Sequence, residues 1–165
     1  MENAELRRKR VRDFYPLPAS KSAKLGPTRS CRSSILTAAG GLPLGLSRPK
    51  DDTPGCTTEG IAFSALRKKF DAAKTVVLGV SKDSIEKHCK FRDKHNLTVR
   101  LLSDEDGKML EAYGVWGEKS LYGRKFMGIT RTTFLIDEKG VVRKVWPKVK
   151  VNGHADEVLV AAKEL

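Results

Sequence analysis

The sequence has 165 residues, 39% of them hydrophobic and 32% charged, which is typical of one compact domain that can bury its own core. No apolar run approaches the ~18 residues of a membrane span, and three cysteines are too few for a disulfide scaffold, so we expect no membrane partner and a cytoplasmic, reducing location. The net charge of +12 is uneven, since residues 1–50 hold 11 Lys and Arg against 3 Asp and Glu. The remainder has both signs interspersed, and no groove-reading element is specified, so we expect no specific nucleic-acid partner.

Residues 1–48 form an atypical, basic segment. They contain the run Arg7–Arg10, four of the seven prolines and the glycine-rich stretch 40–45. No part alternates like a long strand or keeps a helical apolar stripe for more than a turn. We therefore predict weak order for 1–48 and place the folded domain at 49–165.

From residue 50 the pattern is regular. Thr53 and Pro54 are typical of a helix start, and Phe63, Leu66 and Phe70 continue that helix as one apolar stripe. The later elements are predicted in chain order as a buried strand at 75–80, a helix from Ser81 or Asp83 to about His95, a strand at 99–102 and a short helix at 107–113. A hairpin of 132–136 and 141–146 and a final helix at 155–165 complete the chain. We expect Ile85 and Phe91 to point inward and His154 to be a cap or surface residue. This alternation predicts an α/β fold with a central sheet covered on both faces.

Cys56 is the residue most suited to chemistry. If Thr53 caps the helix, Cys56 lies in its first turn, where unpaired amides and the positive end of the helix dipole favour a thiolate. A thiolate is the form of cysteine that attacks electrophiles. In an arbitrary protein, a small buried cysteine near a helix start is the commoner interpretation.

The segment Lys50–Glu59 (KDDTPGCTTE) resembles the active-site loop of peroxiredoxins, specifically the bacterioferritin comigratory protein or peroxiredoxin Q branch. Pro49, Thr53 and Cys56 meet the family spacing Pro-x-x-x-Thr-x-x-Cys. Further blocks follow in the family's order, namely VLGVS at 77–81, LLSDED at 101–106, YGVWG at 113–117, YGRKFMGITRTTF at 122–134 and VWPKVKVNGH at 145–154. The resemblance covers about residues 49–165 and implies a thioredoxin-like fold, with a central mixed sheet flanked by helices.

The resemblance also implies roles for individual residues. Cys56 would reduce hydrogen peroxide and organic hydroperoxides and become a sulfenic acid. Thr53 would place its hydroxyl on the thiolate or the incoming oxygen, and Pro49 would shield the sulfur from water. Arg131 would hold the thiolate and polarise the O–O bond, because a guanidinium stays charged at physiological pH. Taken alone, Arg131 would be interpreted as an exposed arginine beside a strand.

The residue that would remove the sulfenic acid is indicated less clearly. Many relatives have a second cysteine five residues after the first, where this chain has Ile61. Other members of the branch place a resolving cysteine in the next helix, so Cys89 is the candidate. The alternative is that Cys89 is structural and an external thiol resolves the sulfenic acid. Cys31 is expected to be a bystander. The resemblance implies thioredoxin or a similar dithiol as reductant and a monomer, and we predict no cofactor and no metal.

One departure from the family concerns the strand before the active-site loop. Leu42, Leu44 and Leu46 alternate, but Pro43 cannot donate to a ladder and Gly45 adds no packing. The N-terminal strands are therefore degenerate or missing: either this stretch still serves as a poor strand, or residues 1–48 are foreign to the catalytic part. A second hypothesis for function follows, a catalytically impaired thioredoxin-like module whose basic tail binds a polyanion.

Overall fold

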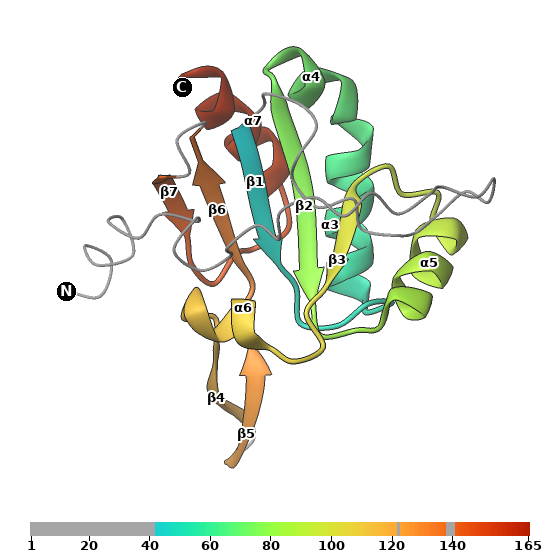
Figure 1. Ribbon diagram of the computed structural model, residues 1–165, viewed down its shortest axis with the longest axis vertical. Coiled ribbons are helices and arrows are strands. Elements are labelled where there is room, and N and C mark those ends of the chain that lie inside the picture. Colours follow the sequence, from blue (N-terminus) through green and yellow to red (C-terminus); the bar gives the residue numbers. More distant parts are fainter. Residues whose placement is uncertain (1–41, 122, 138–140) are drawn as a thin grey trace, which may run out of the picture.

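The computed structural model describes residues 42–121, 123–137 and 141–165 (Figure 1). The weak order predicted for the first 41 residues, and Cys31 with it, lies outside this part of the chain. No helix in the described ranges is both long enough and apolar enough to cross a membrane.

The described elements alternate between helices and strands, as the sequence pattern predicts. In chain order they are β1 (Leu42–Ser47), α3 (Pro54–Ala65), α4 (Arg67–Ala72), β2 (Thr75–Ser81), α5 (Ile85–Lys94), β3 (Arg100–Ser103), α6 (Lys108–Ala112), β4 (Trp116–Leu121), β5 (Arg124–Ile129), β6 (Thr132–Ile136), β7 (Val142–Trp146) and α7 (His154–Lys163).

Five strands form a central mixed sheet in the order β3-β2-β1-β6-β7. Strand β1 pairs in parallel with β2 and antiparallel with β6, and the two outer pairs continue these directions (Figure 1). Because β1 ends beside β2 and next to the start of β6, the loop after β1 and the segment before β6 meet at one end of the sheet. The site described below lies there.

Strand β1 is present and central, so the stretch that the sequence left undecided does serve as a strand. Pro43 is aligned with Val76 of β2, whereas pairing with β6 begins only at Leu44. Proline is tolerated where a strand is paired on one side. Leu42–Ser47, which lies ahead of the boundary predicted at residue 49, thus belongs to the sheet.

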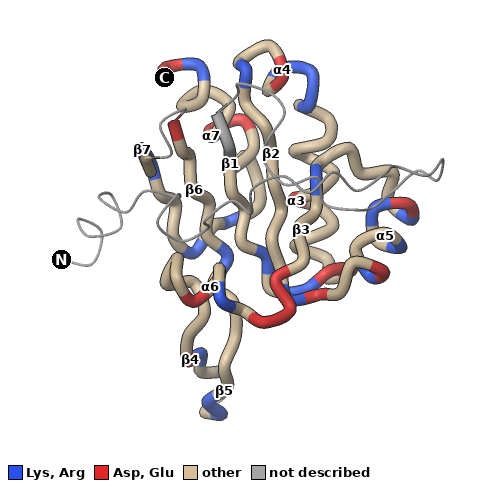
Figure 2. Tube along the Cα trace, viewed as in Figure 1, with Lys and Arg blue, Asp and Glu red and all other residues tan. Residues whose placement is uncertain are grey.

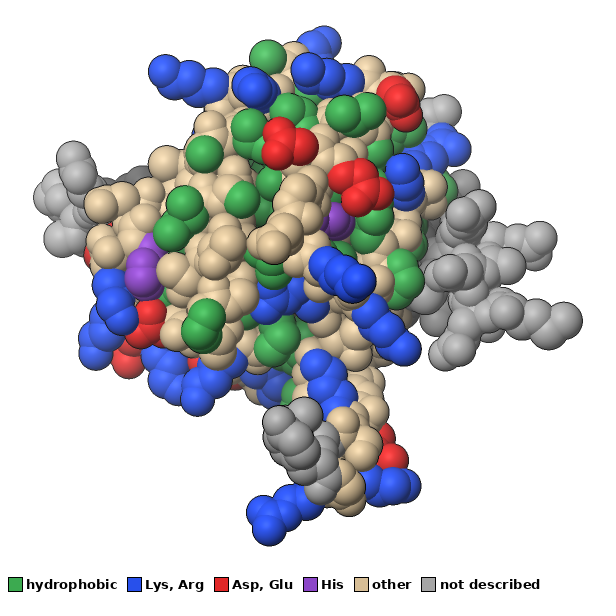
Figure 3. Space-filling model, turned by 180° about the vertical axis from the view of Figure 1, so that it is seen from behind, with side chains coloured by type: hydrophobic (Ala, Val, Ile, Leu, Met, Phe, Trp, Pro, Cys, Tyr) green, Lys and Arg blue, Asp and Glu red, His purple; other side chains and the backbone are tan. Residues whose placement is uncertain are grey.

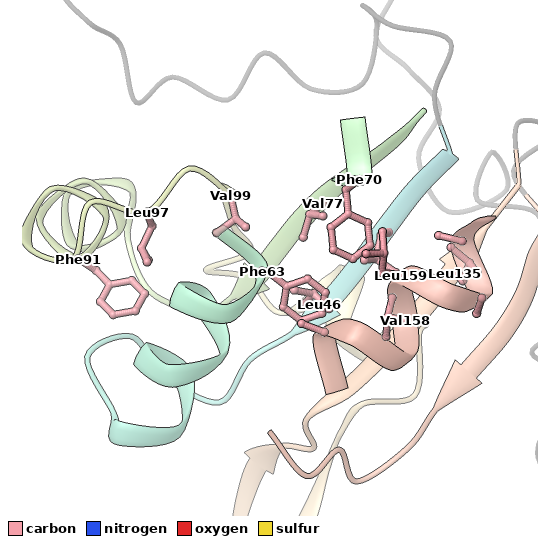
Figure 4. Close-up of a cluster of buried hydrophobic side chains, with 14 residues drawn as sticks. Leu46, Phe63, Phe70, Val77, Phe91, Leu97, Val99, Leu135, Val158 and Leu159 are labelled. Carbon is pink, nitrogen blue, oxygen red and sulfur yellow. The ribbon is translucent and has the colours of Figure 1, made fainter. Parts of the chain in front are cut away.

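The two faces of the sheet have separate cores. Leucines 44 and 46 of β1 face a large cluster with Phe63, Phe70 and residues of α7, and Phe91 of α5 joins it at the edge (Figure 4). The opposite face holds a smaller cluster around α6, with Leu110, Phe134 and Ile136. Helices α3, α4 and α7 therefore cover one face and the short helix α6 covers the other (Figure 1).

Strands β4 and β5 form a separate two-stranded hairpin that the sequence did not predict. It projects from the foot of the molecule with Lys and Arg residues near its tip (Figure 2), whose side chains extend into solvent (Figure 3). Phe126 and Met127 on this hairpin are about half exposed. Most side chains of β5 face solvent, so the strand lacks the alternation of a half-buried strand and its sequence carries no strand signal.

Four details differ from the sequence prediction. The first helix is broken at Leu66 into α3 and α4, and α5 begins after Ser84 rather than after Ser81 or Asp83. Ile85, expected to point inward, is 45% exposed because it lies on the outer side of the first turn of α5. His154, expected as a cap or surface residue, is the buried first residue of α7 after the N-cap Gly153, and Thr133 Oγ1 lies 2.8 Å from its Nε2 atom.

Candidate active site

Cys56 lies in the first turn of α3, as predicted. Thr53 occupies the N-cap position and Pro54 the first helical position. The Cys56 thiol is free and its side chain is wholly buried. The predicted capping hydrogen bond is absent: the Thr53 hydroxyl instead donates to the carbonyl oxygen of Lys50 at 3.1 Å. The amides of the first turn therefore have no side-chain cap. The positive end of the helix dipole lies at this same end of α3, where Cys56 is found.

Arg131 lies against the sulfur, between strands β5 and β6. Its Nη2 atom donates to Cys56 Sγ at 3.3 Å, which joins residues 75 positions apart. The close approach depends on Gly55, since a Cβ atom there would lie 2.9 Å from Arg131 Nη2. A positive charge and the positive end of a helix dipole thus lie at the same sulfur.

Glu59 lies one turn after Cys56 on the same buried side of α3. Its Oε2 atom is 3.6 Å from Arg131 Nη1, and its side chain is 1% exposed. Within the described residues, neither Glu59 carboxylate oxygen has a hydrogen-bond partner. Burial raises the pKa of Glu59, and the positive charges of Arg131 and Arg48 oppose that rise in part. Glu59 therefore holds the far side of the guanidinium by charge.

Ser47, the last residue of β1, fixes the backbone on both sides of Arg131. Its hydroxyl lies 2.9 Å from the carbonyl oxygen of Thr130 and 3.0 Å from that of Thr132. The amide of Thr132 also donates to Ser47 Oγ at 2.9 Å. A small polar side chain at this point of the sheet thereby sets the direction in which Arg131 leaves the backbone.

The loop between β1 and α3 is tied down by buried charges. Arg48 Nη2 donates to Asp51 Oδ1 at 2.7 Å, and the other Asp51 oxygen bonds to His88 Nδ1 of α5. The backbone amide of Asp51 donates to Asp83 Oδ2 at 2.7 Å. A single carboxylate thus connects the end of β1 to α5, and it does so away from solvent.

The next residue makes a second, exposed connection to α5. Asp52 accepts from Lys94 Nζ at 2.7 Å and lies 2.9 Å from His95 Nε2. Hydrogen bonds from His95 and Lys94 lower the pKa of Asp52. Its backbone has φ of 61°, in the left-handed region that aspartate tolerates better than most residues. The loop therefore turns sharply between two ties to the same helix.

A pocket of about 370 Å³ opens between the active-site loop and the hairpin. Pro49 and Lys50 form one wall, and residues of β4 and β5, including Lys119 and Phe126, form the other. Burial, with a contribution from the charge of Arg131, lowers the pKa of Lys119. The charge of Arg131 thus reaches the pocket, which combines lysine ammonium groups with aromatic and thioether side chains.

Comparison with known proteins identifies the family to which this chain belongs. A family model described as the AhpC/TSA family matches residues 46–145. The chain belongs to the AhpC/TSA family. Peroxiredoxin Bcp of Bacillus subtilis is 49% identical over 117 residues, 71% of this chain and 74% of the relative. Peroxiredoxin Bcp of Xanthomonas campestris is 50% identical over 115 residues, 70% of this chain and 72% of the relative.

Solved structures agree with these relatives. Peroxiredoxin Q of Xanthomonas campestris superposes with a TM-score of 0.73 at 47% identity, covering 76% of this chain and 80% of that chain. Peroxidoxin BcpB of Mycobacterium tuberculosis gives a TM-score of 0.67 at 32% identity, with the same coverage. The predicted branch, the thioredoxin-like fold and the activity of a thiol peroxidase are thereby confirmed.

In this peroxiredoxin the structure brings Cys56 and Arg131 together, as expected from the resemblance. Thr53 stands three residues before the sulfur at the N-cap, and Pro49 is exposed at the pocket wall. Cys89 lies half-buried on α5, directly after His88; the thiol of Cys56 is free, so no disulfide joins Cys56 and Cys89 here. No cluster of His, Cys, Asp or Glu in the described ranges is arranged to hold a metal ion.

Sequence reasoning missed the supporting residues of this peroxiredoxin. They share a polar or charged side chain that the sequence alone suggests is solvated: Ser47, Arg48, Asp51, Glu59 and His88. One signal was available for Glu59, because a residue three positions after a buried helical cysteine shares its buried side. The others are brought to the site from β1, the loop and α5, and no spacing along the chain links them.

Proposed function

We propose that Cys56 is the peroxidatic cysteine of this thiol peroxidase. The thiolate attacks the terminal oxygen of a hydroperoxide, so that an S–O bond forms while the O–O bond breaks. Sulfur is oxidised to a sulfenic acid, and the peroxide is reduced to an alcohol, or to water in the case of hydrogen peroxide, after the departing oxygen takes up a proton. The single observation that carries this proposal is the 3.3 Å hydrogen bond from Arg131 to Cys56 Sγ at a helix start.

The neighbouring residues have separate parts in this proposal. Arg131 stabilises the thiolate and the negative charge that develops on the departing oxygen. Glu59 and Ser47 orient Arg131 by charge and by the backbone. Thr53 holds the loop through its bond to Lys50 and, once substrate is bound, turns its hydroxyl toward the reacting oxygens. Pro49 narrows the entrance beside the sulfur.

The pocket next to Pro49 suits the organic part of a hydroperoxide. Trp116, Phe126 and Met127 offer apolar surface close to the segment that leads into Arg131. Replacing Phe126 by Ser is expected to raise the KM for cumene hydroperoxide and to leave the KM for hydrogen peroxide unchanged, because only the former needs apolar contact. Steady-state kinetics with both peroxides measure this, and equal changes for the two would remove the pocket from substrate binding.

A second thiol must then attack the sulfenic sulfur, forming a disulfide and releasing water. We propose Cys89 of the fully reduced protein for this step, since the adjacent His88 already contacts the active-site loop. Thioredoxin or a similar dithiol then supplies two electrons and two protons that restore both thiols. This cycle requires a reducing compartment such as the cytoplasm, and it can be completed within a monomer.

The first test replaces Cys56 by Ser and follows peroxide consumption with reduced thioredoxin. Activity is expected to vanish, whereas the matched change Cys31→Ser leaves it intact. Equal rates in the parent and in Cys56→Ser would contradict the proposal. Cys89→Ser tests resolution: the sulfenic acid should persist after one turnover, as detected by a dimedone label, and an unchanged thioredoxin-dependent rate would exclude Cys89.

The role of Arg131 can be tested without removing it. Gly55→Ala places a methyl group where the guanidinium lies, and the guanidinium can swing away because it ends a flexible side chain. We expect the second-order rate with hydrogen peroxide to fall about tenfold while stability is kept, because alanine favours a helix more than glycine does. Stopped-flow fluorescence measures the rate. Ile61→Ala, an exposed change in the same helix, serves as the control.

A further inference from the structure

Three buried side chains connect the active-site loop to α5. Arg48 ends the path at β1, Asp51 stands in the loop and His88 lies on the helix; their side chains are at most 5% exposed. Asp51 uses one oxygen for Arg48 and the other for His88. His88 Nε2 continues the path to the carbonyl oxygen of Leu102 at 3.2 Å. We refer to Arg48, Asp51 and His88 as the Asp51 clamp.

Asp51 is the centre of this clamp because both Arg48 and His88 bond to its carboxylate. Within the described residues, the Nε and Nη1 atoms of Arg48 have no hydrogen-bond partner, so its bond to Asp51 carries the buried charge. A buried cation that loses its carboxylate is strongly destabilised, and the surrounding structure opens to readmit water. Loss of Asp51 would therefore release the loop from β1 and from α5 together.

The loop leads directly into the turn that buries the reactive sulfur. Cys56 is wholly buried, so no second thiol can contact its sulfur while the first turn of α3 keeps its place. Only four residues separate Asp51 from Cys56, and one of them, Asp52, has a left-handed backbone. Opening of the loop is thus coupled to opening of the turn, whose first backbone bond runs from the Thr57 amide to the Thr53 carbonyl at 2.9 Å.

We propose that the Asp51 clamp sets how often the first turn of α3 opens, and hence how fast the Cys56 sulfenic acid meets its resolving thiol. Asp51, Arg48 and His88 are then positioning residues for the second half of the cycle. The attack on peroxide, a far smaller reactant than a protein thiol, uses the closed state, in which Arg131 donates to Cys56 Sγ. The kinetic part of this inference rests on the proposed function, whereas the coupling of clamp to turn does not.

Asp52 provides a matched control, because it ties the same loop to the same helix from an exposed position. Hydrogen exchange followed by mass spectrometry compares Asp51→Asn with Asp52→Asn. In Asp51→Asn, amides of 52–60 should exchange about tenfold faster or more, while those of β2 keep the parent rate; in Asp52→Asn all rates should stay within about twofold, since exposed pairs contribute little. Equal acceleration in both variants, or none in Asp51→Asn, would overturn the proposal.

Circular dichroism shows whether Asp51→Asn folds. If it does not, a second pair of variants, both at His88, tests the same inference. In His88→Asn the amide nitrogen can replace Nδ1 and still donate to Asp51, whereas His88→Leu removes the bond. Exchange in 52–60 should accelerate in His88→Leu and return toward the parent rate in His88→Asn. The same acceleration in both would show that packing alone matters and would overturn the clamp.

Kinetics separate this inference from the proposed function. Rapid mixing of reduced protein with one equivalent of peroxide resolves sulfenic acid formation from its loss. Asp51→Asn should speed the loss severalfold with formation changed less than about twofold, because opening precedes only the second step. A slower formation with an unchanged loss would overturn the kinetic role. If the parent consumes no peroxide, the proposed function fails, and hydrogen exchange still decides whether the clamp controls the turn.

Discussion

The two faces of the central sheet differ in how tightly they are packed, and β1 contributes side chains to both. On the helix-covered face its leucines lie in a large core with phenylalanines from α3 and α4 (Figure 4). On the face toward α6 it presents Gly45 and Ser47, which line an apolar cavity of about 60 Å³. The backbone of β1 pairs on both sides regardless, because ladder hydrogen bonds need no particular side chain.

The comparison shows that core packing and support of the Arg131 segment are divided between the two faces of one strand. Leu46 serves the core, whereas the adjacent Ser47 serves the segment of Arg131. The poorly filled face is therefore the one that supports the active site. Four substitutions test this division, and they are ordered here by the size of the effect that we expect.

Leu46→Ala should have the largest effect. The side chain is buried among Phe63 and its neighbours, so truncation removes apolar contacts and leaves a cavity (Figure 4). We expect the free energy of unfolding to fall by about 2–5 kcal/mol. Urea denaturation measures the loss, with Met127→Ala on the exposed hairpin as the control. A loss below that of the control would mean that β1 does not anchor this core.

Ser47→Ala should come next and should affect activity as well as stability. The change leaves the Thr132 amide without its acceptor and frees the backbone around Arg131. We expect a loss of about 1–3 kcal/mol in unfolding free energy. The second-order rate with peroxide should also fall, because Arg131 no longer leaves the backbone in a fixed direction. An unchanged rate in folded protein would show that Ser47 is structural only.

Gly45→Val should stabilise the protein. A Cβ atom at this position meets nothing within 4 Å, and the added methyl groups enter the apolar cavity. Valine also favours a strand more than glycine does, so we expect a gain of about 1 kcal/mol. The midpoint of urea unfolding measures the gain. A lower midpoint would indicate that the cavity is closed in solution and that the two faces differ less than described.

His154→Gln should have the smallest effect, visible as a change in pH dependence. Burial lowers the pKa of His154 below 6.5; the charge of Glu157 opposes this shift and that of Arg131 adds to it. The folded state then binds fewer protons than the unfolded state, so stability is full above pH 6.5 and falls as the pH drops through the lowered pKa. The variant should lose this slope. Parallel parent and variant curves between about pH 5 and 7.5 would contradict it.

Much of the fold follows from periodicity. Strand β6 has the predicted bounds, and β2, β3 and β7 lie within one residue of theirs, because runs of apolar residues between turn signals are typical of strands in a sheet. The hairpin of β4 and β5 was missed because its side chains are largely exposed. Strand β1 stayed undecided because Pro43 and Gly45 argue against a strand locally, while pairing with β2 and β6 outweighs that preference.

The residues of the candidate site divide in the same way, into those that the sequence predicts and those that only the tertiary structure reveals. The helix start at Thr53 and Pro54 places Cys56 by local rules, and the family resemblance adds Arg131, so the sequence by itself was enough to predict the pair that we propose as reactive. Only the tertiary structure decided that Arg48, Asp51 and His88 are buried together and that Ser47 holds the backbone beside Arg131. A charged or hydroxyl side chain is stable inside a protein only when its partners arrive from other elements, and those meetings are set by packing rather than by spacing along the chain.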